Sequence, residues 1–233
     1  EMLVRTYVGI SGQGRGADAT MLEDIVGDSA LEIGIGYDRL YGQNGDWKTR
    51  IYDGAGPMLR EFTKNGSHDG GMFPRTAIGQ DIIISQHADY SADIRGFSRW
   101  DFNSGFEFWQ YDVGPHAWDI SIADINNDGL LEMSWGSFTP HNGSIGNGTT
   151  DGDCYTLLFN EHGTNLLTQP YLFGSQPDGV LSDMLVRFIP SGPYQLLSFK
   201  SYDPTYYNGT SRIHMRQLDG SILRTKTEIG RAS

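Results

Sequence analysis

Residues 124–132, Asp-Ile-Asn-Asn-Asp-Gly-Leu-Leu-Glu, carry oxygen-bearing side chains at a spacing that suits a bound cation. Calcium takes six to eight oxygen ligands at about 2.3–2.6 Å, and a short loop supplies them from alternate side chains and a backbone carbonyl. Glycine at the sixth position permits the bend that returns the last carboxylate to the ion. We therefore predict a calcium site, with ligands from Asp124, Asn126, Asp128, Leu130 (by its carbonyl) and Glu132.

The loop is not an EF-hand, because the twelfth position, where an EF-hand has its bidentate glutamate, is Trp135. Apolar and polar residues alternate over 118–123 before the loop and over 131–135 after it, which predicts a strand on each side. The competing interpretation is a polar β-turn with spare carboxylates.

A second, altered copy of the loop lies one hundred residues earlier, at 24–32. Asp24, Asp28 and Glu32 match Asp124, Asp128 and Glu132. Val26 and Ser29 stand where the later loop has asparagine and glycine, so one ligand and the turn glycine are absent. We expect this loop to bind calcium weakly or not at all, and we interpret the pair as evidence of internal repetition.

A finer repeat consists of four hairpin signals, each with an Asp/Asn-to-Gly turn between apolar segments. Their glycines are Gly56, Gly105, Gly163 and Gly220, spaced 49 to 58 residues apart. Units of about 50–60 residues with four short strands are typical of propeller blades. The sequence therefore predicts one all-β domain over 1–233, a β-propeller of about four four-stranded blades that is either a small closed ring or part of a larger propeller. Its approximate blades are 17–76, 77–116, 117–178 and 179–230, after a leading strand and linker at 1–16.

Charge and composition limit the classes of partner that the protein could bind. A formal charge of −12 argues against nucleic-acid binding, which needs a basic surface, and favours cation binding. No run of 18 apolar residues is present, so no membrane span is predicted. A single cysteine, Cys154, cannot form an internal disulfide, and its acidic neighbours disfavour the thiolate.

Several features point to an extracellular or cell-surface protein. Weak calcium sites are filled where calcium is millimolar. The first residue is Glu1 and no signal peptide precedes it, so we expect a processed product or a piece of a longer chain. Four Asn-Gly-Ser/Thr sequences are candidate glycosylation sites, although such sequences also form turns: Asn65, Asn142, Asn147 and Asn208.

The loop and the strand after it, residues 123–133, resemble the FG-GAP/VCBS repeat of calcium-binding propellers. More loosely, residues 95–225 are similar to the propeller of family 11 rhamnogalacturonan lyases, through Trp100, His116 and the proline-rich segment 182–197. That family has more blades and several intact acidic loops. The resemblance therefore implies the fold and the calcium site, and it does not carry over the chemistry.

An enzymatic role has little support in the residues. A uronate lyase needs a base, a group that neutralises the carboxylate and an acid. The candidates have no distinctive spacing, and a hydrogen-bonded loop residue is the better interpretation for each: His87, His116, Arg95, Lys200, Tyr90 and Tyr202.

The leading hypothesis is a secreted, calcium-braced binding or adhesion module for glycans or extracellular proteins. Alternatives are a polysaccharide lyase-like enzyme and a structural subunit that self-assembles. Aromatic residues expected near the binding loops are Tyr41, Trp47, Phe138, Tyr206 and Tyr207.

Overall fold

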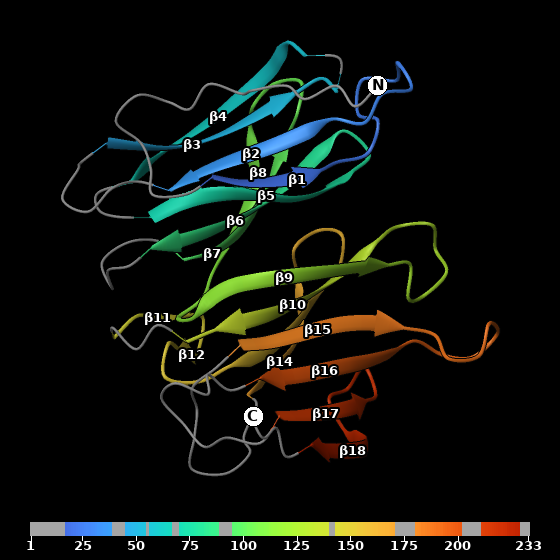
Figure 1. Ribbon diagram of the computed structural model, residues 1–233. Helices are drawn as coiled ribbons and strands as arrows, with labels where there is room; N and C mark the ends of the chain where they lie inside the picture. The colour runs from blue at the N-terminus through green and yellow to red at the C-terminus, as the bar shows by residue number, and fades with distance from the viewer. Residues whose placement is uncertain are drawn as a thin grey trace. The chain divides into compact units, whose positions relative to one another are not determined.

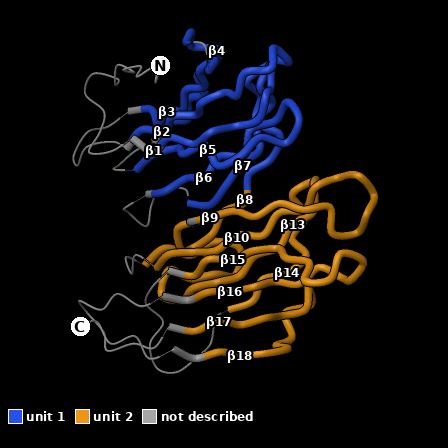
Figure 2. The backbone as a smooth tube through the Cα atoms, turned by 45° about the vertical axis from the view of Figure 1, so that its right-hand side comes forward, with its two compact units in different colours: residues 1–110 blue, residues 111–233 orange. Residues whose placement is uncertain are grey.

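The computed structural model describes residues 17–38, 45–54, 56–66, 70–88, 95–139, 143–170, 180–201 and 211–228. These residues form eighteen β-strands and no helix, so the predicted all-β class is confirmed for them (Figure 1). No described segment is a helix long and apolar enough to cross a membrane. The chain divides into two compact units, residues 1–110 and 111–233 (Figure 2), and each is described separately below.

Unit 1 contains one curled antiparallel sheet in the order β4-β3-β2-β5-β6-β7-β8, with β1 also paired to β2. Its strands follow one another as two four-stranded meanders, β1 to β4 and β5 to β8. Their bounds are β1 Ala17–Met21, β2 Ile33–Asp38, β3 Gly45–Tyr52, β4 Met58–Gly66, β5 Gly70–Ile78, β6 Asp81–Ala88, β7 Gly96–Asp101 and β8 Glu107–Asp112.

Unit 2 repeats this topology in the order β14-β13-β10-β15-β16-β17-β18, with β9 also paired to β10. A two-stranded ribbon, β11 with β12, interrupts the first of its two meanders. The bounds are β9 His116–Ala123, β10 Glu132–Phe138, β11 Ile145–Gly146, β12 Thr149–Thr150, β13 Tyr155–Phe159, β14 Asn165–Pro170, β15 Val180–Val186, β16 Gln195–Ser201, β17 Ser211–Arg216 and β18 Ile222–Glu228.

The four predicted hairpin turns are present, and each joins the last two strands of a meander. In all four the glycine has a positive φ, from 75° at Gly105 to 135° at Gly56, a conformation that costs glycine little. Its N–H donates to a carbonyl three or four residues earlier, at 2.8 to 3.0 Å. The predicted segment boundaries at 76/77 and 116/117 fall inside β5 and β9.

Within unit 1 the two meanders pack face to face. Phe62 of β4 meets Trp100 of β7 edge-on, with ring centroids 5.5 Å apart, and both rings belong to the main buried cluster with Ile51, Met72 and Ile84. Lys64 of β4 also donates to Glu107 of β8 at 2.7 Å. Since β4 and β8 end the sheet order, this bond shows that the sheet curls until its two edges approach.

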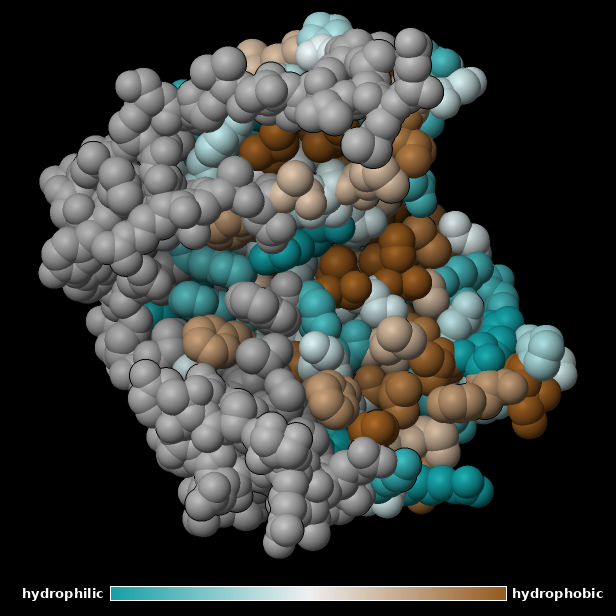
Figure 3. Space-filling view, in the orientation of Figure 1, coloured by the Kyte–Doolittle hydropathy of each residue, from teal (hydrophilic) through white to brown (hydrophobic). Residues whose placement is uncertain are grey.

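In unit 2 the corresponding cluster is Leu158 with Leu185 and Leu196, from one strand of the first meander and two of the second. Other apolar side chains of this unit remain at the surface, among them Met184, Phe188 and Phe199, which are 42% to 60% exposed. The space-filling view shows such apolar residues, in brown, beside polar ones, in teal (Figure 3).

A close backbone approach joins the meanders of each unit at an equivalent glycine. In unit 1, β2 pairs with β5 through Tyr37 and Met72, and a side chain at Gly36 would meet the carbonyl oxygen of Met72. In unit 2, β10 pairs with β15 through Ser137, and Gly136 lies against the carbonyl oxygen of Leu181. The one-hundred-residue repeat therefore includes both the acidic loops and the place where the two meanders of each unit pair.

Candidate metal centres

The two acidic loops occupy equivalent places, since 24–32 connects β1 to β2 and 124–132 connects β9 to β10. The first aspartate of each loop accepts the backbone N–H groups of the residues four and five positions later, and Asp24 also accepts that of Gly27 at 2.6 Å. Asp28 and Ser29 donate to Asp24 at 3.1 and 2.8 Å. The corresponding donors to Asp124 are the residues one hundred positions later, both at 3.0 Å. The carboxylate thus holds the turn in shape in both loops.

Two further hydrogen bonds in each loop have a counterpart one hundred residues away in the other loop. Ala30 donates to Oδ1 of Asp28 at 2.8 Å, as Leu130 does to Asp128. The final glutamate reaches back to the second residue: Ile25 donates to Oε2 of Glu32 at 2.6 Å, and Ile125 donates to Glu132 at 2.8 Å. The backbone path is therefore the same in the two loops, despite the substitutions at 26 and 29.

Ser29 adopts the conformation that the glycine takes in the later loop, with φ of 74° against 87° at Gly129. A non-glycine residue in this region costs about 1–2 kcal/mol, which the surrounding hydrogen bonds must offset. Loss of the glycine therefore has not changed the shape of the loop.

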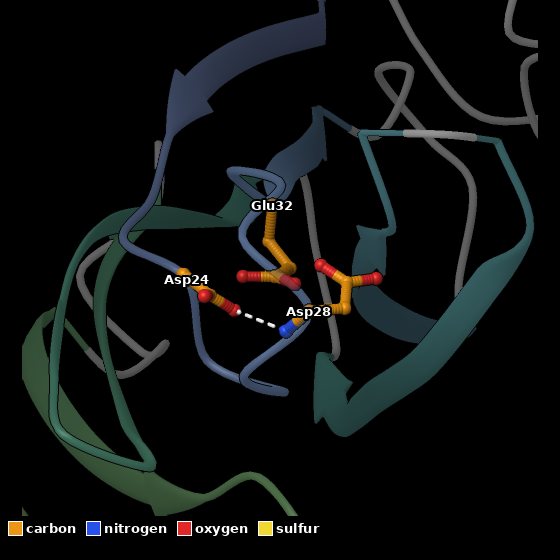
Figure 4. Close-up of side chains that lie close together, drawn as sticks. All are labelled: Asp24, Asp28 and Glu32. Atoms are coloured by element: carbon orange, nitrogen blue, oxygen red, sulfur yellow. Dashed lines mark hydrogen bonds between the residues drawn. The ribbon is translucent and has the colours of Figure 1, made fainter.

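In the first loop the three carboxylates converge (Figure 4). Oxygen atoms of Asp24, Asp28 and Glu32 lie within 4.8 Å of one another, and these are the only three acidic, histidine or cysteine residues that meet this condition among the described ones. Glu32 is 0% exposed, and its Oε1 has no hydrogen-bond partner among the described groups. A buried carboxylate oxygen without a partner is costly, and a cation at this point would compensate it.

In the second loop the amide of Asn126 links the acidic groups. Its Nδ2 donates to Oδ2 of Asp128 at 2.8 Å and to Oε1 of Glu132 at 3.2 Å, while its Oδ1 accepts the N–H of Asp128 at 2.9 Å. An uncharged amide thus satisfies oxygens that lack a donor in the first loop, where residue 26 is valine. Burial raises the pKa of Glu132, and the negative charges of Asp128 and Glu161 raise it further.

This contrast makes the first loop a candidate for cation binding beside the second loop, which the sequence favoured. The loop with the complete ligand pattern satisfies its own carboxylates, and the loop with the altered pattern leaves a buried oxygen that a cation would satisfy. The backbone N–H of Leu130 binds Asp128, and the carbonyl of Leu130 stays a predicted ligand.

A substitution at Asn126 tests the contrast. Asn126→Asp replaces the amide donor with a third carboxylate beside Asp128 and Glu132. We expect calorimetric titration with calcium to give one more bound ion per chain than the parent gives. Asn126→Ala removes the amide donor and leaves the carboxylates as they are in the first loop, where residue 26 is valine, so it should also give one more bound ion than the parent. A stoichiometry equal to that of the parent in both variants would contradict this account.

Among the remaining predicted residues that the structure describes, His116 and Phe138 come together as cross-strand partners of β9 and β10. Trp47 is 2% exposed and packs in the core of unit 1, so the expectation that it lies near a binding loop is wrong. Arg95, a candidate for neutralising a substrate carboxylate, is 1% exposed. His116 is 7% exposed and lies 5.9 Å from the Phe138 ring, whereas His87 lies 5.0 Å from the Phe73 ring. Positions outside the described residues are Tyr41, Tyr90, Tyr202, Tyr206 and Tyr207; Lys200 is described for its backbone alone.

Of the glycosylation candidates, Asn65 is exposed on β4 and Asn147 is exposed in the turn between β11 and β12. The amide of Asn147 donates to the carbonyl of Asp112 at 3.0 Å, and its φ is 41°. Asn142 and Asn208 lie outside the described residues. Cys154, the single cysteine, is buried beside Leu181.

Sequence reasoning missed a polar row that crosses four strands of unit 2 and is buried on β15, β16 and β17. Asp183, Ser198, His214 and Thr225 are successive cross-strand partners on β15 to β18. Thr156 donates to Asp183 at 3.1 Å, and Thr225 lies 3.0 Å from Nδ1 of His214. A signal was present in β16 and β17, where Ser198 and His214 each stand between two apolar residues.

Burial perturbs both ionisable groups of this row. It raises the pKa of Asp183 to about 7, with a further increase from the nearby charge of Asp119. It lowers the pKa of His214 to about 4, and the charges of Arg216 and Arg212 lower it further.

Comparison with known proteins adds no relative: no protein-family model matches this chain, and no curated protein sequence matches it.

Proposed function

We propose that residues 24–32 bind Ca²⁺ and that the chain is a calcium-braced, extracellular β-propeller that acts as a binding or adhesion module. The observation that carries the proposal is the buried, unpartnered oxygen of Glu32 between two exposed aspartates, Asp24 and Asp28. All three ligands are hard oxygen donors, which suits calcium better than a transition metal. Their charge of −3 would be neutralised in large part by a divalent ion.

The ion would act as a brace. Its ligands come from the ends of one connection, so binding would tie the end of β1 to the start of β2. All the charge is supplied by protein carboxylates, and no histidine or cysteine lies among the described ligands to suggest activation of water.

The four consecutive meanders support the propeller. Each contains four antiparallel strands, the last two of which form a tight hairpin, and in each unit the two meanders join through β2 and β5 or through β10 and β15 into one curled sheet. Propellers repeat such sheets around an axis and present their connecting loops for binding. A binding role follows from this scaffold, and glycans or extracellular proteins are the proposed ligands.

Glu32→Gln is the decisive variant, because it removes the charge, keeps an acceptor for the Ile25 N–H and adds a donor like that of Asn126. In the parent, calcium at about one hundred times its dissociation constant should stabilise the fold by about 2.7 kcal/mol, or roughly 5–10 °C in melting temperature. Glu32→Gln should show no calcium shift. Its melting temperature in chelator should equal or exceed that of the parent. Melting curves with millimolar calcium and with chelator measure both.

Glu23→Gln is a matched control, because Glu23 is exposed, lies beside Asp24 and is outside the ligand set. It should keep the full calcium shift. A parent protein that melts at the same temperature in calcium and in chelator would refute the site.

A further inference from the structure

The last hairpin of unit 2 carries a local positive charge in an acidic protein. Residues 211–228 contain Arg212, Arg216, Arg224 and Lys226 against Asp219 and Glu228, a net charge of +2 in a chain of −12. Two of these cations, Arg224 and Lys226, lie on β18, where all residues from 221 to 226 are exposed. Such a reversal of sign marks a surface that attracts an acidic partner.

The register of the hairpin places these cations beside apolar residues. Arg224 is the cross-strand partner of Met215, and Lys226 is the partner of Ile213, so the four side chains share one face of the sheet. Together with Phe188 they line a groove of about 500 Å³. The methylene stems of the two cations can lie along this apolar floor while their charged ends stay accessible.

The groove also contains an unsatisfied acceptor. Gln195, at the start of β16, lines it, and its Oε1 is buried without a hydrogen-bond partner among the described groups. Because β16 lies two strands inside β18, only a side-chain donor that crosses the groove could reach this oxygen.

β18 is the final strand in its sheet, and no described strand pairs with its outer edge (Figures 1 and 2). An edge strand offers a row of backbone N–H and C=O groups to an extended chain. Residues two apart on a strand are about 7 Å apart on the same face. The two cations therefore match acidic side chains at alternate positions of an added strand.

We propose that the outer edge of β18 is a docking site for an extended acidic segment of a partner protein. The segment adds as a further strand and places Asp or Glu side chains beside Arg224 and Lys226. This inference deepens the binding role proposed above and rests on it, but it makes no use of the calcium loops.

Other occupants fit less well. Edge-to-edge pairing with a second copy would bring the cations of two β18 strands together, and like charges on paired strands are destabilising. A glycan site usually offers several aromatic faces, whereas Phe188 is the single aromatic residue among the described residues that line the groove.

The test uses the full chain and a fluorescein-labelled peptide, Gly-Thr-Glu-Val-Glu-Val-Thr-Gly, in anisotropy titrations. We expect the parent to bind it, and the pair Arg224→Gln and Lys226→Gln to bind about tenfold more weakly, because two cross-strand ion pairs are lost. The pair Met58→Glu and Thr63→Glu is the matched control. It gives the same net charge, but it lies on β4, an edge strand of unit 1.

Two further arms separate the alternatives. The pair Arg224→Glu and Lys226→Glu should regain affinity for a peptide with lysine in place of glutamate. A Glu peptide that is N-methylated at alternate residues cannot pair its backbone and should lose binding. Equal binding by this peptide, displacement by polygalacturonate with the same dependence on the two cations, or no binding by the parent would each overturn the proposal.

Calcium distinguishes the two proposals. Peptide affinity should be the same in calcium and in chelator, and Glu32→Gln should bind the peptide like the parent. A failed calcium site with intact peptide binding would refute the brace alone, and the converse would refute the docking edge alone.

Discussion

Gly136→Ala should lower the stability of the protein by about 3 kcal/mol or more, the upper end of the cost of overpacking. A methyl group at this position would overlap the carbonyl oxygen of Leu181 and the carboxylate of Asp119. The backbone oxygen cannot retreat, because Leu181 pairs with Ser137 where β10 meets β15. The N–H of Gly136 also donates to Asp119 at 3.2 Å, so the strand is fixed from both sides.

Gly152→Ala is the matched control in the same unit. The nearest atom to its added methyl would be the side-chain oxygen of Thr150 at 3.8 Å, an ordinary contact. Its stability should change by about 1 kcal/mol or less. Denaturant unfolding followed by circular dichroism measures both variants, and equal midpoints for the two would contradict the proposed close approach. Gly36→Ala should behave like Gly136→Ala, because Gly36 lies against the Met72 carbonyl in unit 1.

The buried pair Asp183 and His214 should give opposite contributions to the pH dependence of stability. The pKa of Asp183 is raised in the folded state to about 7 from an unfolded value of about 3.9. The stability that Asp183 contributes is fully present below its pKa in the unfolded state. That stability is lost as the pH rises through its pKa in the folded state. The pKa of His214 is lowered to about 4. The folded state therefore loses stability through His214 as the pH falls from about 6.5 to about 4.

The two contributions offset each other between about pH 4 and pH 6.5 in the parent. Asp183→Asn removes the first, so its stability relative to the parent should fall on acidification, by at most about 1.4 kcal/mol per pH unit. His214→Gln removes the second, and its stability relative to the parent should rise on acidification. Urea unfolding at half-unit pH steps measures these differences.

The charged side chains around this row also shift the pKa values of Asp183 and His214. Asp119 on β9 raises the pKa of Asp183, whereas Arg216 on β17 lowers it, and Arg216 and Arg212 both lower the pKa of His214. The double variant Asp183→Asn and His214→Gln serves as the control, since its difference from the parent should be nearly independent of pH over this range. Parallel pH profiles for the parent and both single variants would show that neither group is perturbed in this sense.

Much of the local structure was predictable because short segments decide it. The Asp/Asn-to-Gly turns at Gly56, Gly105, Gly163 and Gly220 formed hairpins, since a glycine with positive φ and nearby backbone bonds suffices. The equivalence of 24–32 and 124–132 also held, because the bonds that shape each loop join residues no more than seven positions apart.

The sequence by itself therefore determined the all-β class, the hairpins and the backbone path of the acidic loops. Only the tertiary structure decided the burial of Glu32, the packing of Trp47 in the core, the close approach at Gly136 and the polar row through Asp183 and His214. Alternation along a strand assigns side chains to two faces, but it does not say which face becomes buried. That choice depends on strands that meet from distant parts of the chain, such as β10 and β15, whose paired residues lie more than forty positions apart.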